Sequence, residues 1–416
     1  MERRTFLGLA AGAGLSSLLI GCETTESANA SVRPGGRLQV GIVGGGMLGA
    51  SIAMYCARGG AEVTLLEKAA PAAGATSKSL AWINPFHNDK TYMGLRLESI
   101  KRWQALDKQL GMNAIWGGHV GFTDKPEDKG RFDIQARELA DYGFPTKPLD
   151  QAELKHMSPD IDPGKLVEAY YSELGGHLDP VHATNRYLEA AKIAGAKILY
   201  PCTVSAIEPG GNLSAGVDIV TSRGRMHFDR LIVVAGVDTP KMLAPLGYKL
   251  PLLYKPGALV HSKPMPILTR KVYDGPSPLE WKQAANGSIV GLEASVPPAH
   301  VAAHAGILSE PMDFPPGIAE LHGNRILSKF AAYMPAVKEA EFNFMTLGFR
   351  PFPVDDRPVV GPVPGAPAVS MCVTHSGVTL APVLGEAIAN EVVGGQLEPM
   401  LASYRPTRSF QQTQPA

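Results

Sequence analysis

Cysteine is scarce in this sequence. Four of the 416 residues are cysteines, and no two of them have the CxxC spacing of zinc or redox sites. If Cys22 is consumed in processing, Cys56, Cys202 and Cys372 remain, which is an odd number. The sequence therefore does not indicate a disulfide framework, and we predict no metal site.

The sequence also lacks an excess of charge, internal repeats and low-complexity tracts. Lysine plus arginine and aspartate plus glutamate number 39 each, so no global field would attract nucleic acid or an anionic membrane surface. The hydrophobic content of 45% is ordinary, and 416 residues are enough for two domains with buried cores. We therefore expect a globular protein that binds no nucleic acid.

The N-terminal apolar stretch, which ends at Ile20, is too short to span a bilayer comfortably. It follows Arg3 and Arg4 and resembles a twin-arginine signal, an address that sends folded proteins across the bacterial inner membrane. Glu2 and Gly8 depart from the usual pattern of that signal. The stretch nevertheless predicts export.

Residues 19–22 read Leu-Ile-Gly-Cys and resemble a lipobox, in which the cysteine is lipidated and anchors the mature protein. The alternative is a chance cysteine near a signal-peptidase site. We predict a signal peptide over 1–22, a flexible linker over 23–36, and a periplasmic location with a lipid anchor at Cys22.

A glycine loop follows the first apolar run of the mature chain. The run covers 37–43, the loop reads Gly-Gly-Gly-Met-Leu-Gly, and 50–58 is compatible with a helix. In a GxGxxG motif the three glycines serve the tight turn, the close approach of a pyrophosphate and helix packing, and the diphosphate lies on the helix N-terminus. The cofactor-binding residues predicted here are Gly44, Gly46, Met47, Leu48 and Gly49.

A second apolar strand, expected at 62–66, ends in Glu67, eighteen residues beyond Gly49. A carboxylate at this place bonds a ribose hydroxyl and argues against a 2′-phosphate. A glycine-rich turn with a surface glutamate would not explain why strand, loop, helix, strand and acid occur in this order. The segment predicts a dinucleotide site that includes Glu67 and Lys68, without separating FAD from NAD.

Later segments distinguish FAD from NAD, because they resemble motifs of a known family. Residues 74–79 read Gly-Ala-Thr-Ser-Lys-Ser, and 229–236 form an apolar run that ends in Ala-Gly. Gly-Phe-Arg-Pro at 348–351, Asp-Asp-Arg-Pro-Val-Val-Gly at 355–361 and Thr-His-Ser-Gly-Val-Thr-Leu-Ala-Pro at 374–382 follow. The last three are similar to the GxRP, DGxPxxG and GHxxxGxxLAP motifs of the D-amino-acid oxidase, glycine oxidase and sarcosine oxidase family. The resemblance covers nearly the whole mature chain, with Asp356 where the second motif has glycine.

The resemblance implies an FAD cofactor, which we expect to be bound non-covalently. It also implies a helix that begins near Pro382 and whose positive N-terminus faces the flavin. Cys372 raises the question of covalent flavin, but its apolar surroundings favour a buried strand cysteine. The further cofactor-binding residues that the resemblance implies are Thr76, Ser77, Val204, Ala235, Gly236, Gly377, Val378 and Thr379.

These segments predict an α/β fold with two domains. A Rossmann-like FAD-binding domain, with a parallel sheet and helices on both sides, takes residues 37–85, 161–247 and 345–405. An α+β substrate domain with a mainly antiparallel sheet takes 86–160 and 248–344, and 406–416 form a tail. A small ligand is then expected between the domains.

Arg350 is the predicted catalytic residue. Amine oxidation by flavin requires a neutral, oriented amine, and an amino-acid carboxylate suits the bidentate fork of arginine. The family resemblance places a substrate-binding arginine here, whereas the alternative is an arginine that pairs with Asp355 or Asp356. No tyrosine can be assigned to the pocket, since Tyr254, Tyr273 and Tyr333 are equally plausible. His375 could influence the flavin, but a histidine before a glycine turn is as often a local hydrogen-bonding residue.

The predicted function is oxidation of the C–N bond of a small amine or amino acid, such as a D-amino acid, glycine or an N-methyl amino acid, with oxygen or a quinone as acceptor. One alternative is an anchored D-amino-acid dehydrogenase that passes electrons to a quinone. Another is an exported FAD-binding lipoprotein that has lost its chemistry.

Overall fold

The computed structural model describes residues 36–293 and 317–411. The predicted signal peptide, its Cys22 and all but the last residue of the predicted linker lie outside these residues. Within the two described ranges, no helix combines the length and apolarity that a membrane crossing requires.

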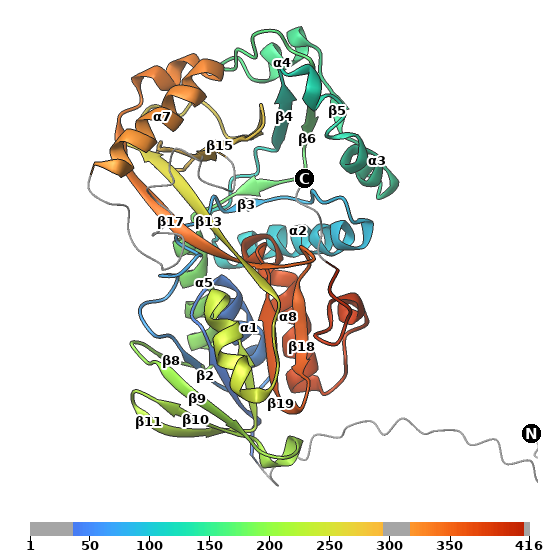
Figure 1. Ribbon diagram of the computed structural model, residues 1–416, viewed down its shortest axis with the longest axis vertical. Helices are drawn as coiled ribbons and strands as arrows, with labels where there is room; N and C mark the ends of the chain where they lie inside the picture. Colours follow the sequence, from blue (N-terminus) through green and yellow to red (C-terminus); the bar gives the residue numbers. More distant parts are fainter. Residues whose placement is uncertain (1–35, 294–316, 412–416) are drawn as a thin grey trace, which may run out of the picture.

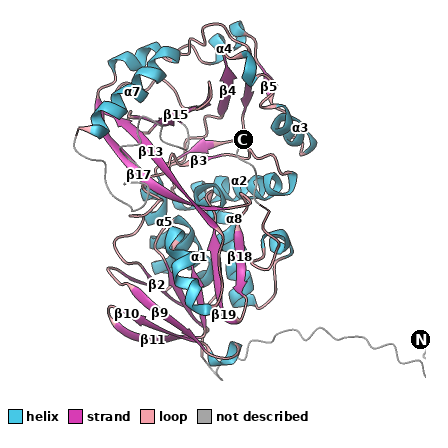
Figure 2. Cartoon of the chain, in the orientation of Figure 1, coloured by secondary structure: helices cyan, strands magenta, loops and turns pink. Residues whose placement is uncertain are grey.

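One half of the molecule is built on a six-stranded sheet (Figures 1 and 2). Its strands are, in spatial order, β18 (Val359–Val363), β19 (Ala366–Val373), β12 (Arg230–Val233), β1 (Gln39–Val43), β2 (Glu62–Leu66) and β8 (Lys197–Leu199). All neighbours are parallel except β18 and β19. The chain order reverses at β1, between β2 and β12, and such a reversal is where open α/β sheets bind ligands.

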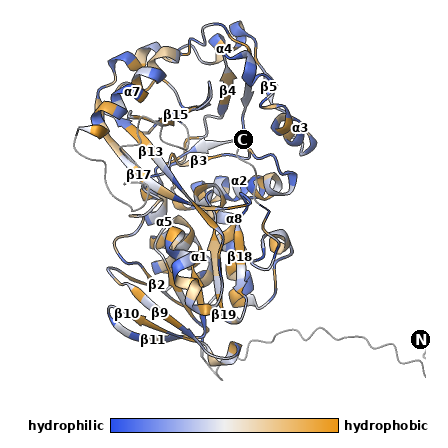
Figure 3. Cartoon of the chain, in the orientation of Figure 1, coloured by the Kyte–Doolittle hydropathy of each residue, from blue (hydrophilic) through white to orange (hydrophobic). Residues whose placement is uncertain are grey.

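Helices cover one face of this sheet and a small sheet covers the other. The helices are α1 (Met47–Arg58), α2 (Lys90–Leu110), α5 (Pro180–Ile193) and α8 (Gly377–Gly394), which share one apolar core with the sheet. The apolar residues of this core give the orange colour around α1 and α8 in Figure 3. On the opposite face, for which the sequence also predicts helices, lie mainly β9 (Val204–Pro209), β10 (Val217–Thr221) and β11 (Gly224–Phe228), with the short α6 (Thr239–Leu243).

The other half is built on an eight-stranded sheet. Its strands are, in spatial order, β17 (Phe342–Pro353), β13 (Leu252–Ser262), β16 (Ile289–Glu293), β15 (Leu279–Gln283), β14 (Val272–Asp274), β4 (His119–Thr123), β6 (Glu168–Ser172) and β5 (Lys147–Pro148). Only β14 and β4 pair in parallel. One face packs against α7 (Ile318–Tyr333), and α3 (Asp133–Asp141) and α4 (Gln151–Met157) lie near the far edge (Figure 1). A two-stranded sheet of β3 (Trp82–Ile83) and β7 (Gly176–His177) completes the fold.

The architecture confirms the predicted α/β class, with one mostly parallel and one mostly antiparallel sheet. Two strands within segments assigned to the FAD-binding domain nevertheless pair in the eight-stranded sheet. These are β6, within 161–247, and most of β17, within 345–405. The division of the chain into domains stays a prediction.

The expectation of a helix beginning near Pro382 is corrected, because α8 already begins at Gly377. Proline has no N–H and therefore leaves the carbonyl four residues earlier, that of Val378, without its helical donor. Trp103 Nε1 of α2 donates to Val378 O at 3.0 Å. A side chain distant in sequence thus replaces the missing bond, which local sequence does not reveal.

Candidate functional site

The glycine loop lies where β1 ends and α1 begins, and two glycines are required by close backbone contacts. Gly44 has φ +118°, and a Cβ there would lie 2.5 Å from Val234 O at the end of β12. A Cβ on Gly49 would lie 1.9 Å from Gly44 O. The loop therefore wraps tightly around the start of α1, whose first N–H groups remain available for an anion.

Glu67 faces this loop from the end of β2. Its Oε2 accepts a hydrogen bond from Gly45 N at 2.7 Å, and its Oε1 accepts one from Ala69 N at 2.9 Å. Lys68 Nζ lies 2.5 Å from Asp238 Oδ2, in the turn that follows β12. The predicted acid and its neighbour thus lie at the point where the strand order reverses.

The loop that contains Thr76 and Ser77 closes over the same point. Thr76 Oγ1 accepts a hydrogen bond from Met47 N at 3.2 Å, at the start of α1. Ser77 N donates to Ala72 O at 3.1 Å, and Ala72 N in turn donates to Gly45 O at 2.9 Å. Both predicted residues therefore lie beside the helix N-terminus.

The remaining predicted cofactor residues also converge here. Ala235 and Gly236 follow β12 directly, and Val204 begins β9 two residues after Cys202, whose N–H donates to Glu67 O at 2.7 Å. A Cβ on Gly377 would lie 3.5 Å from Leu48 Cδ1, so the start of α8 contacts the glycine loop. Val378 and Thr379 form the first turn of that helix.

A buried arginine fixes the start of α8, which the sequence did not predict. Arg96 of α2 donates from Nη1 to Ser376 Oγ at 2.8 Å and from Nε and Nη2 to Asn84 at 3.0 and 2.6 Å. Ser99 Oγ donates to Thr379 O at 2.6 Å. These bonds hold the N-terminus of α8 against α2 and keep its N–H groups free for a ligand.

The eight-stranded sheet has two different faces. Trp281 of β15 stacks on Phe330 of α7, with ring centroids 5.2 Å apart. Because strand side chains alternate, Glu280 and Lys282 point to the opposite face, which we call the inner face. Lys282 Nζ donates to Leu178 O at 3.0 Å, so the inner face looks toward the six-stranded half.

Arg350 lies on the inner face of β17, in contact with a pair of glycines. Gly257 of β13 pairs with Gly348 of β17, two residues before Arg350. A Cβ on Gly257 would have only Arg350 Nε, at 3.8 Å, and Gly348 O, at 3.9 Å, within contact range. Gly257 therefore leaves space for a flat ligand beside the arginine. The position over Gly348 is filled instead by Lys78, whose Cβ would lie 2.9 Å from a Cβ there. Burial lowers the pKa of Arg350, while the nearby charges of Glu280 and Asp356 raise it.

The alternative role of Arg350, pairing with a neighbouring aspartate, is not what the structure shows. Asp355 accepts two hydrogen bonds from Arg408, at 2.8 and 3.0 Å. Asp356 Oδ1 lies 2.6 Å from His375 Nε2, and its Oδ2 lies 3.4 Å from His87 Nε2. Within the described ranges, neither carboxylate forms an ion pair with Arg350.

Asp356 keeps the turn that its glycine counterpart would form, because its φ is +59°, in the left-handed region. Burial raises the pKa of its carboxyl, but the two histidines outweigh burial and hold that pKa below its usual range. His375 also stacks on Phe352, with centroids 4.2 Å apart. Burial lowers the pKa of His375, so His375 is part of a local hydrogen-bond network beside Arg350.

Several buried polar atoms between the two halves have no hydrogen-bond partner within the described part of the chain. Such atoms are costly unless a ligand satisfies them. They are Trp82 Nε1, both ring nitrogens of His119, Tyr170 OH, Thr346 Oγ1 and Arg350 Nε. Together with the glycine loop and the open space over Gly257, they fit a large, partly polar, planar ligand that reaches from α1 to the inner face.

The tyrosines that the sequence left open are now separated. Tyr273 points to the α7 side, is 1% exposed and contacts Thr269 Oγ1 at 3.0 Å. Tyr333 OH donates to Asp124 at 3.0 Å from α7. The side chain of Tyr254 lies outside the described atoms. Tyr170, which sequence reasoning missed, is on the inner face.

The inner face also carries two acids and two bases that the sequence analysis did not single out. For Glu280 and Lys282 the signal is the alternation in Leu-Glu-Trp-Lys-Gln at 279–283, which places both charges on one side of a strand. Asp274 pairs in register with Glu280 and forms an ion pair with Arg131. Burial lowers the pKa of Lys282 to about 7.

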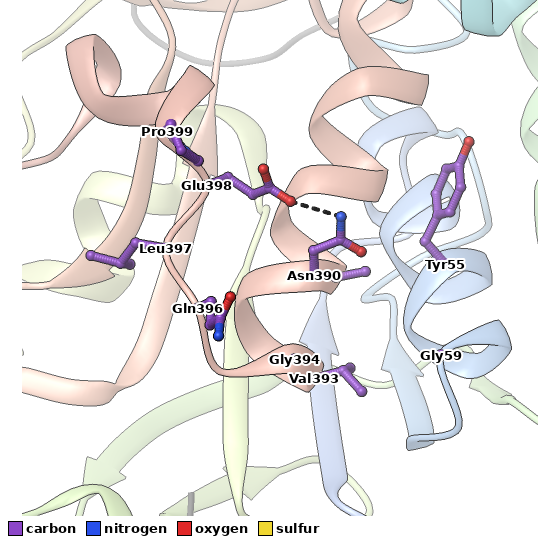
Figure 4. A pocket seen from close by; sticks show the side chains of 10 residues that line it. Tyr55, Gly59, Asn390, Val393, Gly394, Gln396, Leu397, Glu398 and Pro399 are labelled. Carbon is purple, nitrogen blue, oxygen red and sulfur yellow. Dashed lines mark hydrogen bonds between the residues drawn. The ribbon is translucent and has the colours of Figure 1, made fainter. Parts of the chain in front are cut away.

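A cavity of about 410 Å³ lies elsewhere, at the far ends of α1 and α8 (Figure 4). Tyr55, Gly59 and Asn390 line it, and Asn390 donates to Glu398 at 2.7 Å. Helix α8 has 18 residues, so this cavity is roughly 25 Å from the helix N-terminus at a rise of about 1.5 Å per residue. It is therefore separate from the candidate site.

Cys372 lies in the core of β19, with 2% exposure. Burial raises the pKa of its thiol. Cys56 and Cys202 are likewise buried and free. Such thiols are inert, which favours non-covalent cofactor binding. Within the described ranges, no cluster of His, Cys, Asp or Glu side chains could hold a metal ion.

These features define a dinucleotide-binding α/β protein with a second, antiparallel sheet over the binding site. The family model of FAD-dependent oxidoreductases of the DAO type matches residues 39–391. The chain therefore belongs to this family, and FAD is its cofactor.

Individual relatives are distant. Glycine oxidase of Geobacillus kaustophilus is 24% identical over 386 residues, which cover 89% of this chain and 97% of the relative. Human mitochondrial dimethylglycine dehydrogenase is 24% identical over 220 residues, but this match spans only 25% of that longer protein.

Solved structures share the fold. The crystal structure of glycine oxidase from Geobacillus kaustophilus has a TM-score of 0.79 at 21% identity, covering 90% of this chain and all of that one. L-proline dehydrogenase from P. horikoshii has a TM-score of 0.77 at 21% identity, covering 89% and 97%. At these identities the likeness shows the fold.

Proposed function

We propose that the protein oxidises the C–N bond of a small amino acid or amine. The observation that carries this proposal is Arg350, half-buried on the inner face beside Gly257, with a buried Nε that has no partner within the described residues. A guanidinium next to an open space suits a substrate carboxylate. Glycine oxidase and L-proline dehydrogenase, whose names denote amino-acid substrates, share the fold.

The proposed roles follow from position. The glycine loop, Glu67 and the Thr76 loop hold the dinucleotide part of FAD, and the start of α8 offers its N–H groups to the ring system. When bound, FAD accepts the hydride from the substrate carbon next to the amine. Arg350 orients the substrate, while Trp82 and Phe86, with centroids 5.9 Å apart, exclude water from one side.

The test is an anaerobic spectrum of the purified protein before and after addition of D- and L-amino acids, glycine and N-methylglycine. Loss of flavin absorbance with one of these compounds supports the function and identifies a substrate. A flavin that none of them reduces contradicts it. Formation of hydrogen peroxide in air then indicates oxygen as acceptor, whereas its absence during turnover with a quinone indicates a dehydrogenase.

We further propose that the protein is exported by the twin-arginine route and anchored through Cys22. The support is the order Arg3, Arg4, apolar stretch and Leu-Ile-Gly-Cys in the sequence, all outside the described residues. Cell fractionation tests this. Replacement of both arginines by lysine should retain the protein in the cytoplasm, and Cys22→Ser should release it from the membrane fraction.

A further inference from the structure

A row of side chains crosses the inner face at one level. The strand registers place Tyr170 opposite Gly121, Gly121 opposite Asp274, and Asp274 opposite Glu280. Directly paired residues point to the same face of a sheet. The row thus leads from an aromatic hydroxyl to two carboxylates.

The glycine in this row brings the tyrosine toward the acids. A Cβ on Gly121 would lie 2.3 Å from Tyr170 Cε1, so the tyrosine ring lies over the space that a side chain would fill. Tyr170 is 6% exposed, and its OH has no partner within the described residues. A buried hydroxyl of this kind, leaning toward two carboxylates, points to a ligand between them.

The two acids differ in their partners. Asp274 forms an ion pair with Arg131. The described contacts include no hydrogen bond or ion pair of the Glu280 carboxylate, so this acid has no direct partner among the described residues. Arg350 approaches from the other end, over Gly257, close enough for the two charges to affect each other.

We propose that Glu280 binds the amine of the arriving substrate as a cation, which loses its proton before oxidation, while Arg350 binds its carboxylate, so that the site selects small amino acids over simple amines. This inference rests on the proposed function. It adds the residue that recognises the second charged group of a zwitterion, where one half-buried acid and one half-buried cation lie on the same face of the sheet.

The ionisation of Glu280 makes the proposal measurable. Burial and the nearby Asp274 charge raise the pKa of Glu280 to about 7, against the lowering effect of Arg350 and Arg131. Lys282, on the same face, also has a pKa of about 7. Other titratable groups near this face include His119, His177, His261 and Tyr170, and burial keeps each of them neutral near pH 7. Asp179 lies close enough to Lys282 to raise its pKa, and Lys255 lies opposite Arg350.

Two ligands that cannot be oxidised allow binding to be measured without turnover. The first, 2-amino-2-methylpropanoate, has an amine but no hydrogen on the reacting carbon. The second, 2-methylpropanoate, is the same molecule without the amine. A bound cation favours ionised Glu280 and a bound anion disfavours it. From about pH 6 to about pH 8 the affinity should therefore rise for the aminated ligand and fall for the deaminated one, each by on the order of tenfold.

The measurement is titration of the FAD-loaded full chain by flavin absorbance change. Glu280→Gln should flatten both pH trends and weaken the aminated ligand about tenfold near pH 8. Glu280→Asp, which retains the charge, should keep both trends and shows whether the fold tolerates change here. Glu341→Gln, at an exposed acid paired with Lys263, is the matched control and should behave as the wild type.

If both ligand affinities depend on pH in Glu280→Gln as they do in the wild type, the titrating group is Lys282, and the proposal is wrong. The same conclusion follows if neither ligand binds. In either case the proposed function stands as long as an amine reduces the flavin. If no amine reduces it, the proposed function itself is wrong whatever the titrations show.

Discussion

The bond between Trp103 and Val378 gives a quantitative test of how α8 is held in place. Trp103→Phe removes the donor to Val378 O, and Pro382 provides no N–H in its place. A buried carbonyl without a donor costs about 1–3 kcal/mol. The smaller ring adds roughly 1–2 kcal/mol of lost packing, since Trp103 is fully buried. We therefore expect a total loss of about 2–5 kcal/mol in the free energy of unfolding.

Pro382→Ala separates the two contributions. An alanine N–H at this position can donate to Val378 O within the helix, so in that background Trp103→Phe should cost only the packing part. Urea denaturation of the four proteins, followed by far-UV circular dichroism, should give a coupling of about 1–3 kcal/mol. Trp281→Phe is the control, because that buried indole N–H has no partner within the described residues. A coupling near zero would refute the reasoning.

Three further predictions concern the site. Gly49→Ala places a methyl group 1.9 Å from Gly44 O and should abolish FAD retention through purification, whereas Gly211→Ala, with no atom within 4 Å, should retain it; equal retention would contradict this account. Arg350→Lys replaces a planar fork by a single ammonium and should weaken 2-methylpropanoate binding by roughly tenfold or more in a flavin titration, and an unchanged affinity would argue against the carboxylate role. Asp356→Asn should destabilise the protein to urea at neutral pH by about 1–3 kcal/mol. Because the folded pKa of this carboxyl is depressed, the difference should shrink as the pH falls below about 4, and a difference independent of pH would show that the charge is not responsible.

The cofactor side could be predicted from the sequence because its determinants are local. The expected strand at 62–66 coincides with β2, and the glycine loop opens α1 as expected. The substrate side is different, since its residues come together only through strand pairing. Glu280 and Tyr170 are 110 positions apart in the chain, yet they lie in one row of the sheet.

Long-range contacts also explain the misplaced helix start. A proline in an apolar segment normally indicates a helix N-terminus. Here the donor that allows Pro382 inside α8 is Trp103, far away in sequence. At Asp356 the sequence departs from the motif but the backbone conformation does not. An aspartate can adopt the left-handed conformation of the glycine it replaces when histidines contact its carboxylate.

The antiparallel pair of β13 and β17 limits how substrates reach the site. The two strands pair from Leu252 and Pro353 to His261 and Phe344 without a break, and the register then shifts at Ser262 (Figure 1). Leu252 packs into the core beside the six-stranded sheet, and Val260 packs into the core beneath α7. One ribbon is therefore built into both halves and resists a hinge motion between them. We accordingly expect substrate entry and product release to depend on local movements of side chains and surface loops, on a timescale shorter than that of domain opening.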